Sequence, residues 1–263
     1  MVKQDLVLQA ESLEALGEMP DGFFQMVYID PPFNTGKTQR LHGKSYEDKF
    51  DDYIDFLEPF LQEGRRILRS DGTMYVQLDS REVHYVKVCL DGIYGRECFL
   101  NEIIWAYDFG NKPKDKWPRK HNTILVYVKD PNGYYFDNEE VERIPYMAPS
   151  LVLSNYGQDH VDRGKMPTDV WWHTIISPTA HERTGYPTQK PMGVVRRMVQ
   201  ASTKEGDWVI DFFAGSGTLG AVAQQLGRRF VLIDKNPDAF DVMVERLDHS
   251  DGLVFDRRNH GEQ

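Results

Sequence analysis

The sequence predicts an α/β fold built on a doubly wound, mostly parallel sheet. Strand-like and helix-like apolar segments alternate through the first half, and residues 208–233 read as a strand, a glycine-containing turn, a helix and a second strand. This alternation is typical of parallel sheets covered by helices on both faces. At 263 residues, the chain fits one large domain or one domain with an insertion.

Apolar periodicity places the elements of the first 130 residues. We expect strands at 5–9, 26–29, 73–79, 102–107 and 122–129, and helices at 12–19, 51–69 and 81–93. Pro59 predicts a kink or a late start in the helix at 51–69. Asp71 and Gly72 are expected to end that element before the strand at 73–79.

Periodicity weakens in the middle of the chain and returns near its end. Turn signals predict a loop-rich insertion at 131–183 between a first half at 1–130 and a second half at 184–263. In the second half we expect a helix at 191–203, begun by Pro191. The unit that follows comprises a strand at 208–212, a helix at 217–226 and a strand at 230–233.

Composition indicates an intracellular protein. No apolar run reaches membrane-spanning length, the N-terminus lacks the core of a signal peptide, and Cys89 and Cys98 lack the spacing of a zinc cluster. We expect a cytoplasmic protein with no metal and no membrane. The net charge of −10 argues mildly against a nucleic-acid partner.

Two basic runs oppose that average. Residues 35–44 and 110–121 concentrate the positive charge, and a solvated face is the ordinary explanation of such runs. The run at 35–44 directly follows a proline-rich loop, which favours a functional role for its positive charge. Their basic residues are Lys37, Arg40, Lys44, Lys112, Lys114, Lys116, Arg119 and Lys120.

The proline-rich loop, YIDPPFNTG at Tyr28–Gly36, follows an apolar run. A residue before proline is held in extended backbone, and proline has no N–H to donate. Asp30 should therefore lie just past a strand end on a stiff loop, with Phe33 projecting nearby. That loop offers an acceptor and a flat apolar face to a flat, amine-bearing ligand; the alternative is a structural turn.

A second loop, FAGSGT at residues 213–218, joins a predicted strand to a predicted helix. Glycine lets backbone approach a ligand, and the free N–H groups of a helix N-terminus bind anions. Asp234, at the end of the next strand, is placed to accept hydrogen bonds from ribose hydroxyls. No G-K-[ST] follows, which excludes a Walker loop. A ligand with one nucleoside and a charged tail, such as S-adenosylmethionine, fits this loop. The alternative is a simple tight turn between strand and helix that binds no ligand.

Taken together, these loops resemble the amino-directed DNA methyltransferases of the permuted β group. The resemblance rests on DPPF at Asp30–Phe33, DFFAGSGT at Asp211–Thr218 and YPTQKP at Tyr186–Pro191, in that family's order. Smaller matches are HNTILVYVK near the middle and DVWW at Asp169–Trp172. The resemblance covers nearly the whole chain and implies a Rossmann-like, S-adenosylmethionine-dependent methyltransferase fold with circularly permuted motifs.

For catalysis, the resemblance implies methyl transfer to a base flipped out of duplex DNA by the motif Asp30, Pro31, Pro32 and Phe33. The Asp30 carboxylate and the Pro31 carbonyl would each accept one hydrogen of the exocyclic amine. Positive charge growing on that nitrogen would be stabilised by Asp30. Phe33 would stack on the flipped base.

For the cofactor, the resemblance implies a site at the glycine loop. Asp211 and the backbone of Phe213, Ala214, Gly215, Ser216, Gly217 and Thr218 would face the methionine part. Asp234 would take the ribose. Thr188 and Lys190 would close over the methionine end, with Lys190 pairing with the carboxylate. The chain has Ala10-Glu11 where the family usually has Gly-Asp, which makes Glu11 the candidate for the adenine.

The resemblance further implies double-stranded DNA as partner, with the basic residues of loops 35–46 and 108–121 contacting phosphates. The 131–183 insertion would read a specific sequence. It also allows a homodimer and a cognate restriction nuclease.

N6 of adenine is the predicted target, because the N4-cytosine group more often has Ser in place of Asp30. N4 of cytosine stays open because it presents a similar amine. Methylation at carbon 5 needs a cysteine nucleophile, usually after proline. Cys89 follows Val88 and Cys98 follows Glu97, so this chemistry is disfavoured. Protein-glutamine methyltransferases typically have Asn before the prolines, so Asp30 argues against that substrate class. A non-catalytic DNA-binding relative would be expected to lose Asp30 or the glycines of the second loop. Both are present, which disfavours that alternative.

Overall fold

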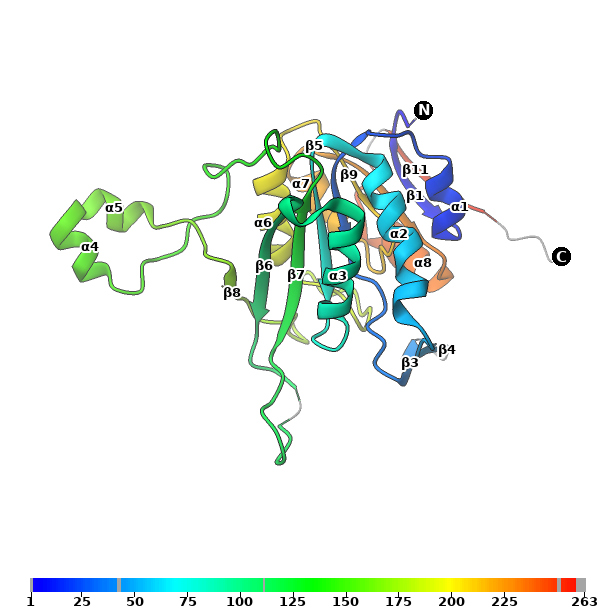
Figure 1. Cartoon of the computed structure of the whole chain (residues 1–263), viewed down its shortest axis with the longest axis horizontal. Coiled ribbons are helices and arrows are strands. Elements are labelled where there is room, and N and C mark those ends of the chain that lie inside the picture. Colours follow the sequence, from blue (N-terminus) through cyan, green and yellow to red (C-terminus); the bar gives the residue numbers. More distant parts are fainter. Residues whose placement is uncertain (1, 42–43, 111, 250–251, 259–263) are drawn as a thin grey trace.

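The computed structural model describes residues 2–41, 44–110, 112–249 and 252–258, with the side chains of 37–47 outside that description. Its large sheet has the order β11-β1-β10-β9-β2-β5-β7-β6-β8 (Figure 1). The strands of this sheet are β1 (Asp5–Gln9), β2 (Phe24–Ile29), β5 (Leu68–Leu78), β6 (Phe99–Ala106), β7 (His121–Val128), β8 (Val170–Trp172), β9 (Trp208–Asp211), β10 (Arg229–Asp234) and β11 (Leu253–Arg257). Neighbours pair in parallel except where β7 meets β5 and β6, which confirms the doubly wound, mostly parallel sheet.

Helices cover both faces of the sheet (Figure 1). One face buries α1 (Ser12–Gly17), α2 (Tyr53–Ile67) and α3 (Val83–Tyr94). The other buries α6 (Met192–Ser202), α7 (Thr218–Gln225) and α8 (Pro237–Arg246). Strand β2 is buried along its whole length, so it is apolar on both sides, as a central parallel strand must be. No helix in the described part of the chain has the length and apolarity to cross a bilayer.

The helix α2 corrects two predictions. It begins at Tyr53 because the side chain of Asp52 accepts hydrogen bonds from the N–H groups of Ile54 and Asp55 (2.9 and 3.1 Å). It then runs through Pro59, so of the two alternatives predicted for that proline, a kink or a late start, the late start was wrong. It also ends at Ile67 rather than at the Asp71-Gly72 turn, which lies inside β5.

Several elements were not predicted. These are the two-stranded ribbon of β3 (Lys37–Leu41) and β4 (Lys44–Asp48), the short 3-10 helix Arg96–Cys98, the helices α4 (Pro149–Tyr156), α5 (Gln158–Arg163) and α8, and the strands β8 and β11. The pair α4 and α5 buries none of its residues and stands away from the body (Figure 1). The 131–183 segment is therefore mainly an excursion from the sheet.

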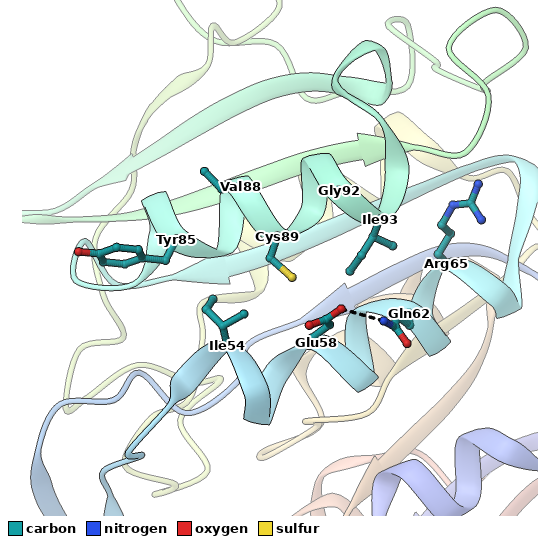
Figure 2. Close-up of a pocket in the computed structure, with 9 residues that line it drawn as sticks. All are labelled: Ile54, Glu58, Gln62, Arg65, Tyr85, Val88, Cys89, Gly92 and Ile93. Atoms are coloured by element: carbon teal, nitrogen blue, oxygen red, sulfur yellow. Dashed lines mark hydrogen bonds between the residues drawn. The ribbon is translucent and has the colours of Figure 1, made fainter.

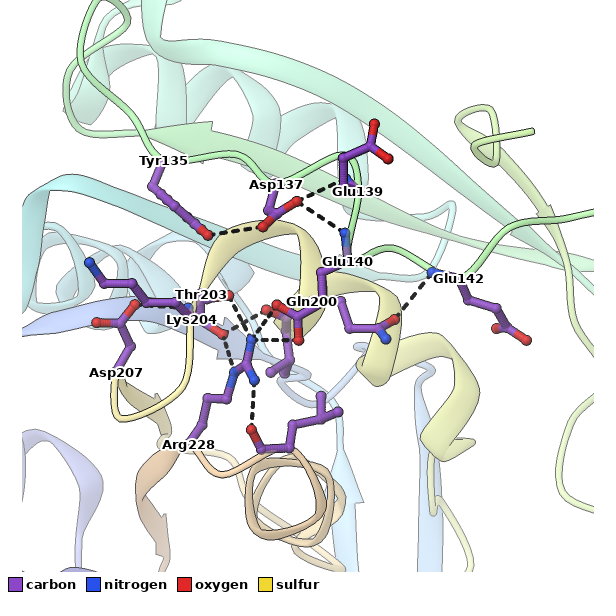
Figure 3. A network of polar contacts seen from close by, with 12 residues as sticks. Tyr135, Asp137, Glu139, Glu140, Glu142, Gln200, Thr203, Lys204, Asp207 and Arg228 are labelled. Carbon is purple, nitrogen blue, oxygen red and sulfur yellow. Dashed lines mark hydrogen bonds and ion pairs between the residues drawn. The ribbon is translucent and has the colours of Figure 1, made fainter. Parts of the chain in front are cut away.

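A buried polar network fixes the base of this excursion (Figure 3). The guanidinium of Arg228 donates to both carboxylate oxygens of Glu140 (2.8 and 2.7 Å) and to the hydroxyl and carbonyl of Thr203 (3.1 and 2.8 Å). Asp137 in turn accepts from the N–H groups of Glu139 and Glu140 (2.8 and 3.0 Å). These contacts tie residues 137–140 to the end of α6 and the start of β10.

Replacing Arg228 by methionine is expected to lower the free energy of unfolding by about 2–3 kcal/mol. The Arg228 side chain is 5% exposed, and its loss leaves Glu140, at 32% exposure, partly buried without its cation. Urea unfolding measures the effect. Arg257→Ala is the matched control, because the ion pair of Arg257 with Asp241 is exposed and should contribute less than about 1 kcal/mol. Equal losses for both variants would contradict this account.

Candidate active site

The two predicted loops meet at one edge of the sheet. Strands β2 and β9 are parallel neighbours, with Val27 opposite Ile210, so Asp30 and Asp211 stand at adjoining carboxyl ends. A cavity of about 660 Å³ opens there, a size typical of small-molecule sites. Apart from Gly217, it is lined by every residue predicted for catalysis or cofactor binding. The DPPF loop and the glycine loop, far apart in the sequence, therefore line one cavity.

The loop after β2 is rigid for reasons beyond its prolines. The hydroxyl of Tyr53 donates to the Pro32 carbonyl (2.5 Å), and the Asn34 N–H donates to Asp48 Oδ1 (2.8 Å). The Asn34 side chain donates to Glu82 (2.8 Å) and accepts from the Phe50 N–H (3.0 Å). Asn34 adopts a positive φ of 51°, which asparagine tolerates better than most residues. Sequence reasoning missed Asn34 and Asp48 as residues that position Asp30.

Asp30 is paired with Lys190. The Lys190 ammonium donates to Asp30 Oδ2 and lies 5.1 Å from the centroid of the Phe33 ring. Both side chains are largely buried, at 13% exposure for Lys190 and 15% for Asp30. Asp30 Oδ1 is buried and has no hydrogen-bond partner among the described residues. The prediction that Lys190 pairs with a cofactor carboxylate stays a prediction; in this structure its partner is the catalytic candidate.

The glycine loop leads from β9 into α7. The Gly215 N–H donates to Asp234 Oδ2 and the Asn236 N–H to Asp234 Oδ1 (2.8 and 2.9 Å), so Asp234 holds the loop that it faces. Gly217 has a φ of 71°, and a Cβ there would come within 2.7 Å of Met243 Cγ. Gly220 completes a G-x-G-x-x-G spacing, and a Cβ on it would come within 2.6 Å of Leu232. The third glycine thus lets α7 pack closely on β10.

Three buried carboxyl groups line the cavity, and burial raises the pKa of each. Burial raises the pKa of Asp30, although Lys190 opposes the shift. Burial raises the pKa of Asp211 well above its usual range; the Phe213 N–H lowers it, while Asp30 and Asp234 raise it. Burial also raises the pKa of Asp234, against the hydrogen bonds from Asn236 and Gly215. A bound cation would relieve these costs.

An aromatic wall faces the acidic residues. Phe50 stacks on Phe56 with ring centroids 4.2 Å apart, and Phe60 lies 4.9 Å from Phe213. All four rings line the cavity. The sequence analysis treated Phe56 and Phe60 only as part of the helix 51–69; their spacing of four residues was the available signal.

These features fit S-adenosylmethionine, which carries a flat adenine, a ribose, and positive charge on its sulfonium and α-amino groups. The aromatic wall suits the adenine, and the clustered carboxylates suit the positive charges. Glu11 lies at the same cavity, paired with Lys235 (3.5 Å). No group of three His, Cys, Asp or Glu residues in the described part of the chain is arranged to hold a metal ion.

The basic loops lie at the same edge of the sheet. Loop 107–120 follows β6, which runs parallel to β2, and it extends on the same side as the β3–β4 ribbon (Figure 1). Lys112, Lys114, Lys116 and Arg119 are exposed, and the Lys120 ammonium donates to the Gly110 carbonyl (3.0 Å). The side chains of Lys37, Arg40 and Lys44 lie outside the described residues.

Three tryptophans near the basic loop and strand β8 differ in exposure. Trp171 is 8% exposed and packs in the core, whereas Trp172 is 75% and Trp117 93% exposed. Trp117 therefore lies outside the core and stands on loop 107–120 among the lysines.

A second hollow, of about 770 Å³, lies between α2 and α3 on the outer face (Figure 2). Its walls mix apolar side chains such as Val88 with the hydrogen-bonded pair Gln62 and Glu58 (2.9 Å). None of the predicted site residues lines it.

Comparison with known proteins identifies a family for the chain. The model of the DNA methylase family of N6- and N4-directed enzymes matches residues 24–245. Type II methyltransferase M.HpaI of Haemophilus parainfluenzae is 30% identical over 240 residues, which cover 91% of this chain and 73% of that protein. DNA adenine methyltransferase YhdJ of Escherichia coli K12 is 28% identical over 246 residues, which cover 92% and 82%.

Solved structures share the fold. The cytosine-N4-specific PvuII DNA methyltransferase superposes with a TM-score of 0.70 at 16% identity, covering 95% of this chain and 89% of that one. The M1.HpyAVI–SAM complex superposes with a TM-score of 0.62 at 18% identity, covering 92% and 98%. The chain therefore belongs to the N6- and N4-directed DNA methylase family, whose members methylate DNA with S-adenosylmethionine as the methyl donor.

Proposed function

We propose that this methyltransferase acts on the exocyclic N6 of adenine at a specific sequence in duplex DNA. The observation that carries the proposal is Asp30 itself, a carboxylate on a rigid Asp-Pro-Pro-Phe loop, facing the cavity that the glycine loop also lines. The relative named as a DNA adenine methyltransferase supports adenine. The likeness to a cytosine-N4-specific enzyme concerns the fold, and N4 of cytosine is the second candidate.

Residues of the loop would make the amine nucleophilic. The lone pair of the adenine amine is delocalised into the ring, which makes the nitrogen a poor nucleophile. Asp30 and the Pro31 carbonyl would accept the two amine hydrogens and favour a pyramidal nitrogen. As the nitrogen gained the methyl group, positive charge would grow on it beside Asp30, which would then take the surplus proton. Phe33 would stack on the base, and fixed alignment would supply much of the rate gain. S-adenosylmethionine supplies an electrophilic methyl group.

Cofactor roles follow the cavity walls. Asp211 and the loop from Phe213 to Thr218 would bind the methionine part, and Asp234 the ribose. Glu11 and the aromatic wall would take the adenine. Thr188 and Lys190 would lie over the methionine end. Duplex DNA would cover the mouth of the cavity, and residues 131–183 would read the DNA sequence. The protein would act in the cytoplasm. A homodimer and a cognate nuclease remain expectations, which light scattering and co-purification would check.

Incubation with labelled S-adenosylmethionine and mixed-sequence duplex DNA, followed by nucleoside analysis, tests the target. N6-methyladenine is the expected product. N4-methylcytosine would replace the proposal by the second candidate. Cofactor binding without transfer to any DNA would favour a non-catalytic relative.

Loop 107–120 is expected to make two kinds of contact with DNA. Replacing Lys112, Lys114 and Lys116 together by alanine should reduce the slope of log affinity against log salt by about 2–3, because each phosphate contact releases counterions. Trp117→Ala should weaken binding by about 1–3 kcal/mol through lost stacking on a base, with the slope unchanged. Lys204→Ala, an exposed lysine at the opposite edge of the sheet, is the control. Salt-insensitive binding by the wild type would contradict this footprint.

A further inference from the structure

The contacts of Lys190 are those proposed for the target amine. Its ammonium donates to Asp30 Oδ2 and lies over the face of Phe33 at 5.1 Å from the ring centroid. A flipped adenine would bring an N–H to the same carboxylate and a ring to the same aromatic face. The ammonium stands over the face of Phe33 on which the base would stack, so Lys190 has to leave this position when the base enters. Asp30 Oδ1 has no partner among the described residues and is open to the amine.

The backbone of Lys190 is anchored while its side chain can turn. The Thr218 hydroxyl donates to the Lys190 carbonyl (3.1 Å), and the Gln189 amide donates to the Glu182 carbonyl (2.5 Å). The Met192 N–H donates to the Glu182 carboxylate (2.9 Å). The four-carbon stem of lysine is flexible, so the ammonium can move within the cavity without any change in the loop.

The cavity offers Lys190 a second anion once the cofactor binds. Thr218 begins α7 within the glycine loop, so its bond to Lys190 places the lysine stem beside the loop proposed to bind the methionine part. S-adenosylmethionine brings its own carboxylate to that place. An ammonium is costly to bury unpaired, so it can leave Asp30 readily only when another anion is present.

We propose that Lys190 is a positioning residue that occupies the place of the target amine and passes to the cofactor carboxylate when the cofactor binds. Cofactor binding thereby opens the base site, which makes the two substrates bind cooperatively. The inference rests on the proposed function and deepens it. The coupling is a free energy shared by both sites, so DNA must strengthen cofactor binding by the same factor.

Titration of DNA binding with and without S-adenosylhomocysteine tests the coupling. The duplex carries the protein's methylation site with its target adenine, and 2-aminopurine beside that adenine reports flipping. In the wild type, S-adenosylhomocysteine should tighten DNA binding about tenfold. 5′-Methylthioadenosine, which keeps the nucleoside but lacks the carboxylate, should change it less than about twofold. DNA should tighten S-adenosylhomocysteine binding by the same tenfold.

Lys190→Met keeps the apolar stem and removes the ammonium. It should flip the base more readily than the wild type without cofactor and should lose the coupling with S-adenosylhomocysteine. Lys190→Ala should behave in the same way, which provides a second variant if the first folds poorly. Lys235→Ala, a cavity lysine paired with Glu11, should keep the wild-type coupling ratio.

The failures are distinguishable. Coupling retained in both Lys190 variants, or equal coupling with 5′-methylthioadenosine, overturns the role of Lys190 while methylation by the wild type stands. Absence of coupling in an active wild type also overturns it. A wild type that transfers no methyl group to any DNA instead overturns the proposed function.

Discussion

Replacement of Asp30 by alanine is expected to lower the rate of methyl transfer about 10²–10³-fold while S-adenosylmethionine still binds. The carboxylate is proposed to accept an amine hydrogen and to stabilise charge that develops only in the transition state, and such groups contribute mainly to kcat. Asp30→Asn should lose nearly as much, because the amide oxygen accepts a hydrogen bond but carries no charge. Single-turnover transfer to DNA and equilibrium cofactor binding measure the two effects separately.

The control for Asp30 is a carboxylate outside the cavity. Asp241 is 60% exposed on α8 and pairs with Arg257, so Asp241→Ala should transfer methyl at the wild-type rate. Transfer by Asp30→Ala at near the wild-type rate would remove Asp30 from the chemistry. A large loss of cofactor affinity in that variant would instead move Asp30 to the cofactor site.

The pH dependence of transfer should report the same carboxylate. Burial raises the pKa of Asp30, and Lys190 limits the rise. The ionised form is the active one, so the rate should fall as pH drops through this raised pKa. That fall should begin above the pH of about 4 at which an exposed aspartate takes up its proton. In kcat/KM at low cofactor concentration, which reports the free enzyme with Lys190 still paired to Asp30, Lys190→Met should move the acidic limb to higher pH, because it removes the charge that opposes burial.

The fold and the cavity were predictable because their signals are local. The apolar runs of β2 and β9 indicated buried parallel strands, and parallel strands bring their carboxyl ends to one edge. Asp30 and Asp211, 181 positions apart, were therefore expected to be neighbours, and the structure places them so. The spacing of Gly215 and Gly217 before a helix likewise indicated the cofactor loop.

Features decided by tertiary contacts escaped the sequence. Asp71-Gly72 looks like a turn, yet it lies within β5, where the backbone carbonyl of Asp71 accepts hydrogen bonds from the Gln25 side chain and the Tyr135 N–H (both 2.9 Å). The Lys190–Asp30 pair joins residues 160 positions apart, and only the folded cavity shows that contact. Strand β11 was missed because its strand conformation depends on pairing with β1 at the sheet edge.

The second large effect is expected at Asp211. Burial raises the pKa of this carboxyl well above its usual range; the Phe213 N–H lowers it, Asp30 and Asp234 raise it, and Lys190 lowers it. A cation placed against it, such as the α-ammonium of S-adenosylmethionine, would favour the ionised form. Cofactor binding should therefore release a proton, and cofactor affinity should increase as pH rises toward the raised pKa.

Asp211→Asn should weaken S-adenosylmethionine binding about 10–100-fold, the value of roughly 1.5–3 kcal/mol for a charge-assisted hydrogen bond, and should abolish this pH dependence. The ligand-free variant should be more stable at neutral pH. An acid whose folded pKa is raised binds its proton more tightly in the native state, so its contribution to stability falls as pH rises from the unfolded pKa through the folded one. Calorimetric titration in two buffers of different ionisation enthalpy, with thermal unfolding at pH 5 and 8, separates these effects. Unchanged affinity in a variant that gains stability would show that Asp211 is buried for reasons unrelated to the cofactor, because the fold alone would then account for its pKa.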